Sequence, residues 1–508
     1  MREAYRMDMD DDACYRALAT RDPRFDGRLF VAVKTTKIYC RPICPAQTPK
    51  RENVRFFATA VAAQEAGFRP CLRCRPEASP ELAFWRGSLS TVSRALSLIE
   101  AGALDEGDVD SLAARLGMGE RQLRRLFHQH LGASPISVAQ TRRILLAKQL
   151  IHETRLPMTE VAMAAGFGSV RRFNETFHEL FKRPPRALRR AAISDEPASI
   201  AGSTEVQLAY RPPYDWDGIV AFLGTRAIPG VEVVADGRYA RTIAIGEGRG
   251  LLTVEPGKGN RLKVTVRFPD LRSLPGIIAR VRRVFDLAAD PVAIGADLRR
   301  DPLLAPLVSA RPGLRVPGAW DGFELALRAV LGQQITVAAA RILAGILVQH
   351  YGERIDDPAA ARLGLTHVFP TPRQLAGRDL AELRMPRARR AAISSLASAA
   401  LADPLIFGAR KSLEDAIAQL RALPGVGEWT AQYIAMRELR EPDAFPAADI
   451  GLLRAMSGEY GTRPSPAELL VRAEGWRPWR AYAALHLWAS DPHAVSAAEK
   501  VRHDQQAA

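Results

Sequence analysis

The chain has no long apolar run: no stretch approaches the ~20 consecutive apolar residues that a membrane-spanning helix needs. Its start, acidic from Met7 to Asp12, also lacks the apolar core of a signal peptide. Cysteine is scarce, with five in 508 residues, which argues against a disulfide-rich secreted scaffold. We therefore expect an intracellular, cytoplasmic protein of bacterial type with no membrane partner.

Positive charge is abundant. Lysine and arginine number 71 against 56 aspartates and glutamates, giving a net charge of +15 and a pI near 10.0. The segment 111–190 alone holds 15 basic and 5 acidic residues. This imbalance predicts a polyanionic partner such as DNA, and the length predicts about three or four domains.

Four of the five cysteines form two close pairs, Cys40 with Cys44 and Cys71 with Cys74. Two loops that each present two thiolates suit one tetrahedral Zn²⁺ ion with Zn–S bonds of about 2.3 Å. Spacing alone leaves open a structural zinc, a reactive thiolate or a pair of disulfides, and the disulfides fit this composition least. The lone Cys14 is predicted to be a small buried residue.

The sequence around the pairs, AVKTTKIYCRPICPAQ and GFRPCLRC, resembles the N-terminal zinc domain of the Ada DNA-repair methyltransferases. The resemblance implies that Cys40 accepts a methyl group from DNA methylphosphotriesters and that Thr36 and Arg69 contact DNA. Pro45 and Gln47 stand where that family has basic residues. The Pro-Cys-His-Arg site of the Ada guanine methyltransferase domain is absent from the sequence.

Apolar residues then recur at helical spacing in two helix-turn-helix units. The predicted helices are 109–116 and a second after Gly117, then 159–166 and 169–181, with a long helix 136–151 between the units. The second unit resembles AraC-type DNA-binding domains. Candidate DNA-contacting residues on the two recognition helices are Arg121, Gln122, Arg124, Arg125, Arg171, Arg172 and Asn174. Each arginine can contact a base edge, a phosphate or only solvent.

A stretch rich in Ser, Ala and acid, 193–205, is a predicted linker to a region of alternating strand patterns. The predicted strands are 206–210, 231–234, 241–245, 251–254 and 262–267, and the predicted helices are 216–223 and 274–285. From about Asp301 to Trp488 the pattern is helical again.

The run LPGVGEWTA at 423–431 places Gly425 and Gly427 in a hairpin between two predicted helices, where backbone N–H groups can bind a phosphate. With Asp449 after it, the run resembles the helix-hairpin-helix DNA glycosylases. The segments 210–216, 328–334, 369–372 and 476–482 extend the resemblance to the AlkA type of 3-methyladenine DNA glycosylase, over about 206–490.

That resemblance makes Asp449 the catalytic carboxylate, which would stabilise an oxocarbenium-like sugar. A helix cap or a structural ion pair is the alternative. Trp429 occupies the position of the Schiff-base lysine of bifunctional relatives, so we expect hydrolysis without strand cleavage. Trp429, Tyr433 and Trp488 are the predicted base pocket rather than ordinary core.

Two departures from this family stand out. Ile450 replaces a tyrosine that commonly follows the catalytic aspartate. Gln334 stands where a relative has a leucine that fills the gap left by the flipped base, so Gln334 and Ile335 are both candidates for that role.

We therefore expect a multidomain, mainly α protein with α+β parts: a zinc-bound Ada-like domain, an all-α double helix-turn-helix domain, and an α+β subdomain with an all-α helix-hairpin-helix glycosylase domain. It would excise alkylated bases, accept methyl groups at Cys40 and regulate transcription. Expected partners are Zn²⁺, alkylated and promoter double-stranded DNA and RNA polymerase, for a monomer associated with the nucleoid. The predicted domain boundaries are 1–80, 84–192, 193–205 (linker), 206–290 and 291–495.

Two rival hypotheses remain at this point. One is a transcription regulator with an inactive glycosylase half. The other is a glycosylase whose zinc and helix-turn-helix half only tethers it to DNA.

Overall fold

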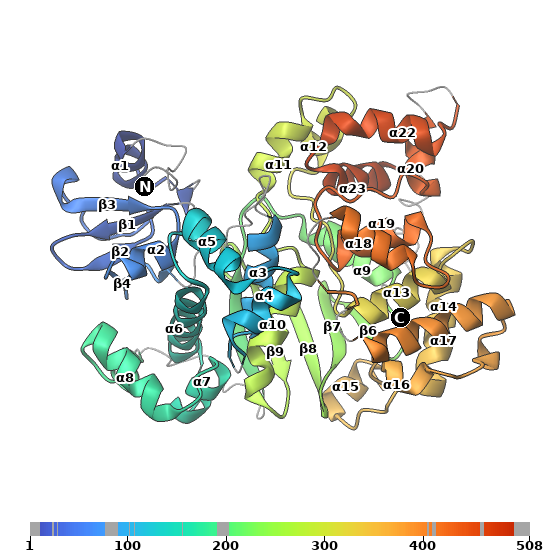
Figure 1. The fold of residues 1–508 in the computed structure, drawn as a ribbon, viewed down its shortest axis with the longest axis horizontal. Coiled ribbons are helices and arrows are strands. Elements are labelled where there is room, and N and C mark those ends of the chain that lie inside the picture. The colour runs from blue at the N-terminus through green and yellow to red at the C-terminus, as the bar shows by residue number, and fades with distance from the viewer. Residues whose placement is uncertain are drawn as a thin grey trace. The chain divides into compact units, whose positions relative to one another are not determined.

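The computed structural model describes residues 11–22, 25–27, 29–76, 90–100, 102–105, 107–154, 156–189, 203–403, 406–408, 413–457 and 462–491. The chain divides into two compact units, residues 1–210 with 270–279 and residues 211–269 with 280–508 (Figure 1). No helix among the described residues combines the length and the apolar character of a membrane span. The predicted linker 193–205 lies outside the described residues up to position 202, and a strand begins at Thr204.

The first unit starts with a small sheet in the order β3-β1-β2-β4. Strand β1 pairs antiparallel with β2 and β3, and β2 pairs parallel with β4. Alternation along the strands buries Ala32 and Tyr39 in one core cluster and Val31 in another. Cys14, on α1, is fully buried in the second cluster, as predicted. The elements are α1 (Asp11–Ala19), β1 (Phe30–Val33), β2 (Ile38–Cys40), η2 (Arg51–Asn53), β3 (Val54–Phe57), α2 (Ala60–Glu65) and β4 (Arg69–Pro70).

The remainder of this unit is helical except for one strand, β5, and it confirms the two predicted helix-turn-helix units. Gly117 adopts a φ of 69° between α4 and α5, and Gly166 a φ of 84° between α7 and α8, so each turn uses a left-handed glycine. Asp108, Ser134 and Ser169 cap α4, α6 and α8 through their side chains. The elements are α3 (Ser90–Glu100), α4 (Val109–Arg115), α5 (Glu120–Leu131), α6 (Pro135–Glu153), α7 (Met158–Ala164), α8 (Val170–Phe181), η5 (Pro185–Leu188) and β5 (Thr204–Ala209).

Within this unit the long helix α6 contacts the loops that carry the cysteines. The fully buried Lys148 donates from Nζ to the Cys71 carbonyl at 2.8 Å, and Arg75 pairs with Glu153 at 2.7 Å. A buried ammonium requires such acceptors. The helix that joins the two helix-turn-helix units is therefore in direct contact with the second cysteine loop.

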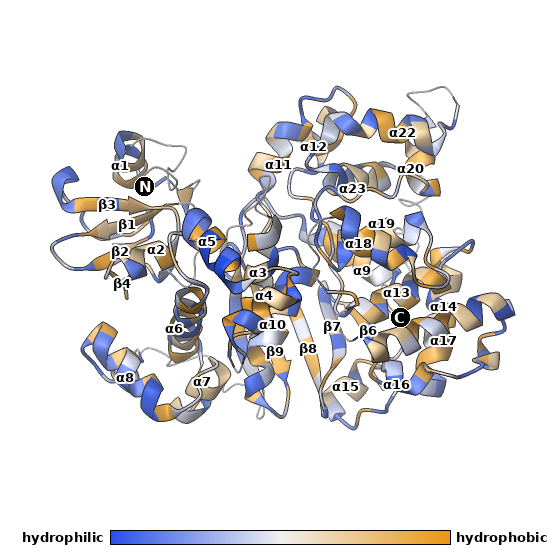
Figure 2. Ribbon diagram, viewed as in Figure 1, coloured by the Kyte–Doolittle hydropathy of each residue, from blue (hydrophilic) through white to orange (hydrophobic). Residues whose placement is uncertain are grey.

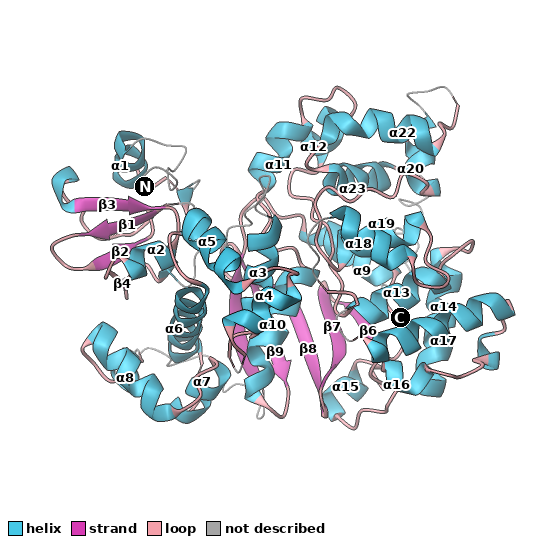
Figure 3. Ribbon diagram, in the orientation of Figure 1, coloured by secondary structure: helices cyan, strands magenta, loops and turns pink. Residues whose placement is uncertain are grey.

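In the second unit four consecutive strands form an antiparallel meander in the order β9-β8-β7-β6, drawn magenta in Figure 3. Asp236 and Gly237, with φ of 52° and 67°, make the tight turn between β6 and β7. The strands are β6 (Glu232–Ala235), β7 (Arg238–Ile245), β8 (Gly248–Pro256) and β9 (Arg261–Arg267).

The helices of the second part of the chain fit the predicted pattern closely. The predicted helices 216–223 and 274–285 are α9 and α10, and a nearly completely buried helix, α13, follows the sheet region. The elements are α9 (Trp216–Thr225), η6 (Leu271–Ser273), α10 (Leu274–Val284), α11 (Pro291–Leu298), α12 (Leu304–Ala310), α13 (Gly322–Leu331), α14 (Val337–Tyr351), α15 (Pro358–Arg362), α16 (Pro372–Leu375), η7 (Ala381–Leu383), α17 (Arg387–Ala402), α18 (Leu413–Arg421), α19 (Glu428–Arg437), α20 (Ile450–Ala455), α22 (Pro466–Ala473), η8 (Glu474–Trp476) and α23 (Arg480–Ser490).

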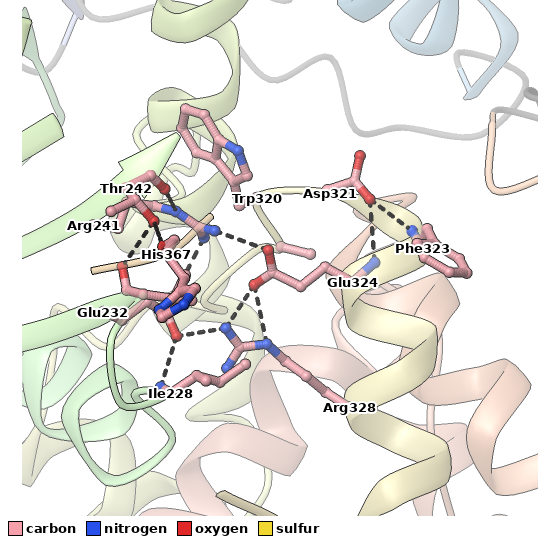
Figure 4. A network of polar contacts seen from close by, with 12 residues as sticks. Ile228, Glu232, Arg241, Thr242, Trp320, Asp321, Phe323, Glu324, Arg328 and His367 are labelled. Atoms are coloured by element: carbon pink, nitrogen blue, oxygen red, sulfur yellow. Dashed lines mark hydrogen bonds and ion pairs between the residues drawn. The ribbon is translucent and has the colours of Figure 1, made fainter. Parts of the chain in front are cut away.

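A buried ionic network joins the sheet to α13 (Figure 4). Arg241 on β7 pairs with Glu324 on α13 at 2.8 Å, and Arg328 on α13 pairs with Glu232 on β6 at 2.5 Å. Burial opposes ionisation of Glu232, but Arg328 and Arg241 lower its pKa to about 2. The network fixes α13, and with it the loop after Leu331, to the sheet.

Candidate active site and metal centre

The two cysteine pairs come together, as their spacing predicted. Their four sulfur atoms all lie within 4.8 Å of one another. Cys40 ends β2, Cys71 follows β4, and the parallel pairing of these strands brings the two loops together. Cys44, Cys71 and Cys74 are buried, whereas Cys40 is only partly buried. Cys40 is therefore the one residue of the four that is not fully buried.

The donor set fits a zinc ion. Backbone N–H groups of Arg41 and Arg73 point at Cys74 Sγ and Cys71 Sγ, each at 3.3 Å. Four sulfurs this close are thiolates together only when a cation compensates their charge. These cysteines form a Zn²⁺ site.

Arg41, which follows Cys40, holds the loops in place and was not singled out in the sequence. It is buried, donates from Nε to Asp26 Oδ1 at 2.7 Å and from Nη1 to the Cys74 carbonyl at 3.2 Å. Because Arg41 directly follows a cysteine ligand, the sequence could have indicated its role. No spacing in the sequence indicated that Asp26 is its partner.

Removing the zinc ion is expected to unfold the small sheet region that carries the cysteines. Zinc binding supplies on the order of 10 kcal/mol to small cysteine-ligated sites, and the strands here are only two to four residues long. Titration with a thiol reagent, before and after a chelator, measures the effect. We expect the four ligand thiols to become reactive, together with Cys14, which is buried in the same region. Equal reactivity before and after chelation would contradict a metal site.

The predicted hairpin lies between α18 and α19. Gly425 has a φ of 79°, and a Cβ built on it would lie 2.5 Å from Ala392 Cβ on α17, so only glycine fits. Gly427 precedes α19 as its N-cap without a side-chain cap, and nothing lies within 4 Å of the position its Cβ would take. The first N–H groups of α19 are thus open to an approaching anion.

Asp449 is the N-cap of α20 and is held by three N–H groups. Its Oδ1 accepts from Leu452 N at 3.1 Å and from Trp488 Nε1 at 2.8 Å, and its Oδ2 accepts from Trp429 Nε1 at 2.9 Å. The helix-cap alternative is thus part of its role, but two tryptophans from other helices also fix the carboxylate. Gly451 makes room for this arrangement, since a Cβ there would lie 3.0 Å from Asp449 Oδ1 and 3.1 Å from Trp488 Cδ1.

The three predicted aromatic residues surround that carboxylate. The rings of Trp429 and Tyr433 stack at 5.2 Å with 9° between their planes, and Trp488 meets Tyr433 edge-on at 6.4 Å. All three are half-buried rather than core. An aromatic wall beside a fixed carboxylate is suited to a flat, electron-poor ring.

Two arginines behind the aromatic wall were missed by sequence reasoning. Arg437 Nη1 donates to Tyr433 Oη at 2.7 Å, and Arg226 stacks on Phe222 at 3.8 Å. Burial raises the pKa of Tyr433, but Arg437 and Arg226 outweigh it and lower the pKa. Arg437 lies four residues after Tyr433, a helical spacing that could have indicated the contact. Arg226, at the end of α9, has the same spacing from Phe222, but nothing in the sequence indicated its effect on Tyr433.

The loop after α13 lies against the hairpin. Gln333 Nε2 donates to the Gly425 carbonyl at 2.8 Å and to Thr430 Oγ1 at 3.2 Å. Gln334 is exposed with a φ of 62°, and Ile335 beside it is also exposed. Both remain candidates for filling the gap left by a flipped base.

The predicted DNA-contacting residues of the first unit lie on exposed surfaces. Arg121 and Arg172 are exposed on α5 and α8, while Arg124 pairs with Glu120 at 2.5 Å and Arg171 with Glu175 at 2.8 Å. Figure 2 shows α5 mostly blue, as expected of a helix that meets water or a polyanion. Thr36 lies in the exposed turn between β1 and β2, and the Arg69 N–H binds the Lys37 carbonyl at 2.8 Å, one residue from Thr36.

Three family models match separate parts of the chain: the metal binding domain of Ada at 13–77, a helix-turn-helix domain at 112–191 and the AlkA N-terminal domain at 205–321. Along almost its whole length the chain is similar to the probable bifunctional transcriptional activator/DNA repair enzyme AlkA of Mycobacterium tuberculosis. Identity is 44% over 489 residues, covering 96% of this chain and 98% of that protein. The chain belongs to the family of these bifunctional transcriptional activator/DNA repair AlkA proteins.

Each half of this AlkA-family chain has relatives of its own. DNA-3-methyladenine glycosylase 2 of Escherichia coli is 39% identical over 286 residues, covering 55% of this chain and 95% of that protein. The bifunctional transcriptional activator/DNA repair enzyme Ada of Escherichia coli is 34% identical over 159 residues, covering 31% of this chain and 43% of that protein. The chain is thus a fusion of an Ada-type regulatory half and an AlkA-type DNA glycosylase half, which favours the combined function over both rivals.

Proposed function

We propose that the protein hydrolyses the N-glycosidic bond of alkylated bases of the 3-methyladenine type in double-stranded DNA. The observation that carries this proposal is the Asp449 carboxylate, fixed by three N–H groups beside the stack of Trp429 and Tyr433. A preorganised anion stabilises positive charge where it develops, without reorganisation during the reaction.

The reaction breaks the bond between C1′ and the base nitrogen, and the electron pair leaves with the base. A cationic alkylated purine departs neutral, so it needs no general acid. The Asp449 carboxylate stabilises the oxocarbenium-like sugar, and water adds to C1′ with loss of a proton. Trp429, Tyr433 and Trp488 bind the flipped base by stacking, while the N–H groups at Gly425 and Gly427 hold a phosphate of the strand.

At the zinc site, Cys40 is the proposed acceptor of a methyl group from a DNA methylphosphotriester. Its sulfur forms a bond to the methyl carbon, the methyl–oxygen bond breaks, and the phosphodiester anion leaves. Zn²⁺, when bound, supplies the charge that keeps the sulfurs as thiolates. The partial exposure of Cys40, in contrast to its three buried neighbours, supports this assignment.

The helix-turn-helix helices complete the proposal. Arg121, Arg124, Arg171 and Arg172 on α5 and α8 contact promoter DNA, with Thr36 and Arg69 contacting DNA near the zinc site. The chain acts as a nucleoid-associated monomer that recruits RNA polymerase. These activities belong to separate predicted domains, at 1–80, 84–192, 206–290 and 291–495, with 193–205 as the linker.

The product of base release is expected to be an intact abasic strand. Trp429 stands where a Schiff-base lysine would be needed, and an indole cannot form an imine with C1′. Incubation with methylated duplex and borohydride, followed by denaturing electrophoresis, tests this. We expect no covalent protein–DNA adduct. A trapped adduct would overturn the hydrolytic assignment, whereas absence of free base without borohydride would overturn the proposed activity itself.

A further inference from the structure

A surface cavity of about 460 Å³ lies beside the hairpin. It is bounded by Pro424 of the hairpin, by the turn at Gly377 to Asp379 and by one face of α17. The lining residues used below are Arg378, Asp379, Arg387, Ser394, Ser395 and Ser398. None of them belongs to the site described above.

The residues that line this cavity carry a net positive charge. Arg378 and Arg387 are exposed, and among the described residues neither makes a side-chain hydrogen bond or an ion pair. The single carboxylate of the lining, Asp379, is already paired with Arg390 at 3.3 Å. The lining therefore holds two arginines against one aspartate, and that aspartate is already paired with a third arginine.

A second feature of the cavity is that arginines lie in the first turn of α17, where the helix dipole disfavours positive charge. The first turn of α17 carries Arg387, Arg389 and Arg390, with no acidic residue and no side-chain cap on Pro386. Cations at a helix N-terminus are unfavourable, and an anion there is favourable. Three arginines in this position are stabilised if an anion binds beside them, and the hydroxyls of Ser394 and Ser395 add neutral donors along the same helix face.

Close packing holds the cavity in a fixed position relative to the hairpin. Gly425 packs so closely on Ala392 that a Cβ would overlap it at 2.5 Å, which locks the hairpin to α17. Arg389, in the first turn of α17, donates from Nη2 to Gln334 Oε1 at 3.3 Å. The helix that borders the cavity therefore contacts both the hairpin and the loop after α13.

We propose that this cavity binds DNA phosphodiester groups next to the phosphate held by the hairpin, with Arg378 and Arg387 as the contacting cations. The inference rests on the proposed DNA-glycosylase function. It extends the footprint of the glycosylase half along one strand, and it makes Arg378 and Arg387 determinants of DNA affinity rather than of bond cleavage.

The test is single-turnover base release by the full-length protein from a short methylated duplex without promoter sequence, at several salt concentrations. For the double variant Arg378→Gln/Arg387→Gln we expect the half-saturating protein concentration to rise about tenfold, with the maximal rate unchanged. The salt dependence should weaken by about two ions, because each lost phosphate contact removes roughly one released counterion. The matched control is Arg354→Gln/Arg362→Gln, which removes the same charge from exposed residues that do not line the cavity.

A second variant, Ser398→Glu, places an acid in the cavity at an exposed helical position and should weaken binding by a similar factor. Unchanged half-saturation and salt slope in both variants, with normal base release, would overturn the cavity proposal and leave the glycosylase intact. If the wild-type protein released no base, the proposed function would fail instead. Fluorescence anisotropy of the same duplex would then decide the cavity's role, with equal affinities of wild-type and variant proteins overturning it.

Discussion

Replacing Asp449 by asparagine is expected to lower the rate of 3-methyladenine release at least about a hundredfold. The amide keeps the shape of the side chain, and its oxygen can still accept from Leu452 N and cap α20. The change removes the hydrogen bond from Trp429 Nε1 and the charge that stabilises the oxocarbenium-like sugar. Loss of one preorganised group of this kind commonly costs on the order of 3 kcal/mol. The measurement is single-turnover release of free base from methylated duplex DNA.

The matched control is Asp357→Asn. Asp357 is also a helix N-cap, accepting from Ala359 N at 2.7 Å and Ala360 N at 3.4 Å, and it lies outside the active site. It should release base at close to the wild-type rate. Wild-type rates from the Asp449→Asn protein, with its fold and DNA affinity retained, would remove this residue from the mechanism.

Replacing Cys40 by serine is expected to abolish methyl uptake completely. A serine hydroxyl stays protonated at neutral pH and is a poor nucleophile toward a methyl carbon, whereas a metal-bound thiolate is a good one. Mass spectrometry of peptides, after incubation with methylphosphotriester DNA, should place a single methyl group on Cys40 in the wild-type protein and none in the variant.

Cys44→Ser separates methyl acceptance from metal binding, because it also removes one of the four ligands but leaves Cys40 in place. We expect slower, residual uptake at Cys40 in this variant. Methyl groups on Cys44, Cys71 or Cys74 in the wild-type protein would contradict the assignment.

Methyl uptake at Cys40 also removes one negative charge from the zinc site, since a thioether is neutral. Methylated protein should therefore bind promoter DNA more tightly, by an effect that salt reduces.

Local patterns in the sequence predicted much of this fold. The turn glycines Gly117 and Gly166, with the apolar spacing around them, placed both helix-turn-helix units, and the pair Gly425 and Gly427 placed the hairpin. These features depend on backbone conformation within a few residues, so the sequence records them directly.

The candidate site was less accessible to local reasoning. The aspartate and its aromatic neighbours were predicted through resemblance, but the two indole N–H bonds to Asp449 join residues 20 and 39 positions away. Arg226 and Lys148 gave no sequence signal either. Their long-range partners, Tyr433 for Arg226 and the Cys71 carbonyl for Lys148, are set by the packing of separate helices and loops. Periodicity shows that a side chain faces the interior and does not say which group it meets there.

One reaction tests the central claim, that two separate sites in one chain carry out two repair reactions. Full-length protein is incubated with duplex DNA that contains both methylphosphotriesters and 3-methyladenine. Free base is measured by chromatography and methylated cysteine by mass spectrometry, in the same sample. The wild-type protein should give both products, Asp449→Asn only methylated Cys40, and Cys40→Ser only free base. Loss of both products in either folded variant, or no free base from the wild-type protein, would contradict the account.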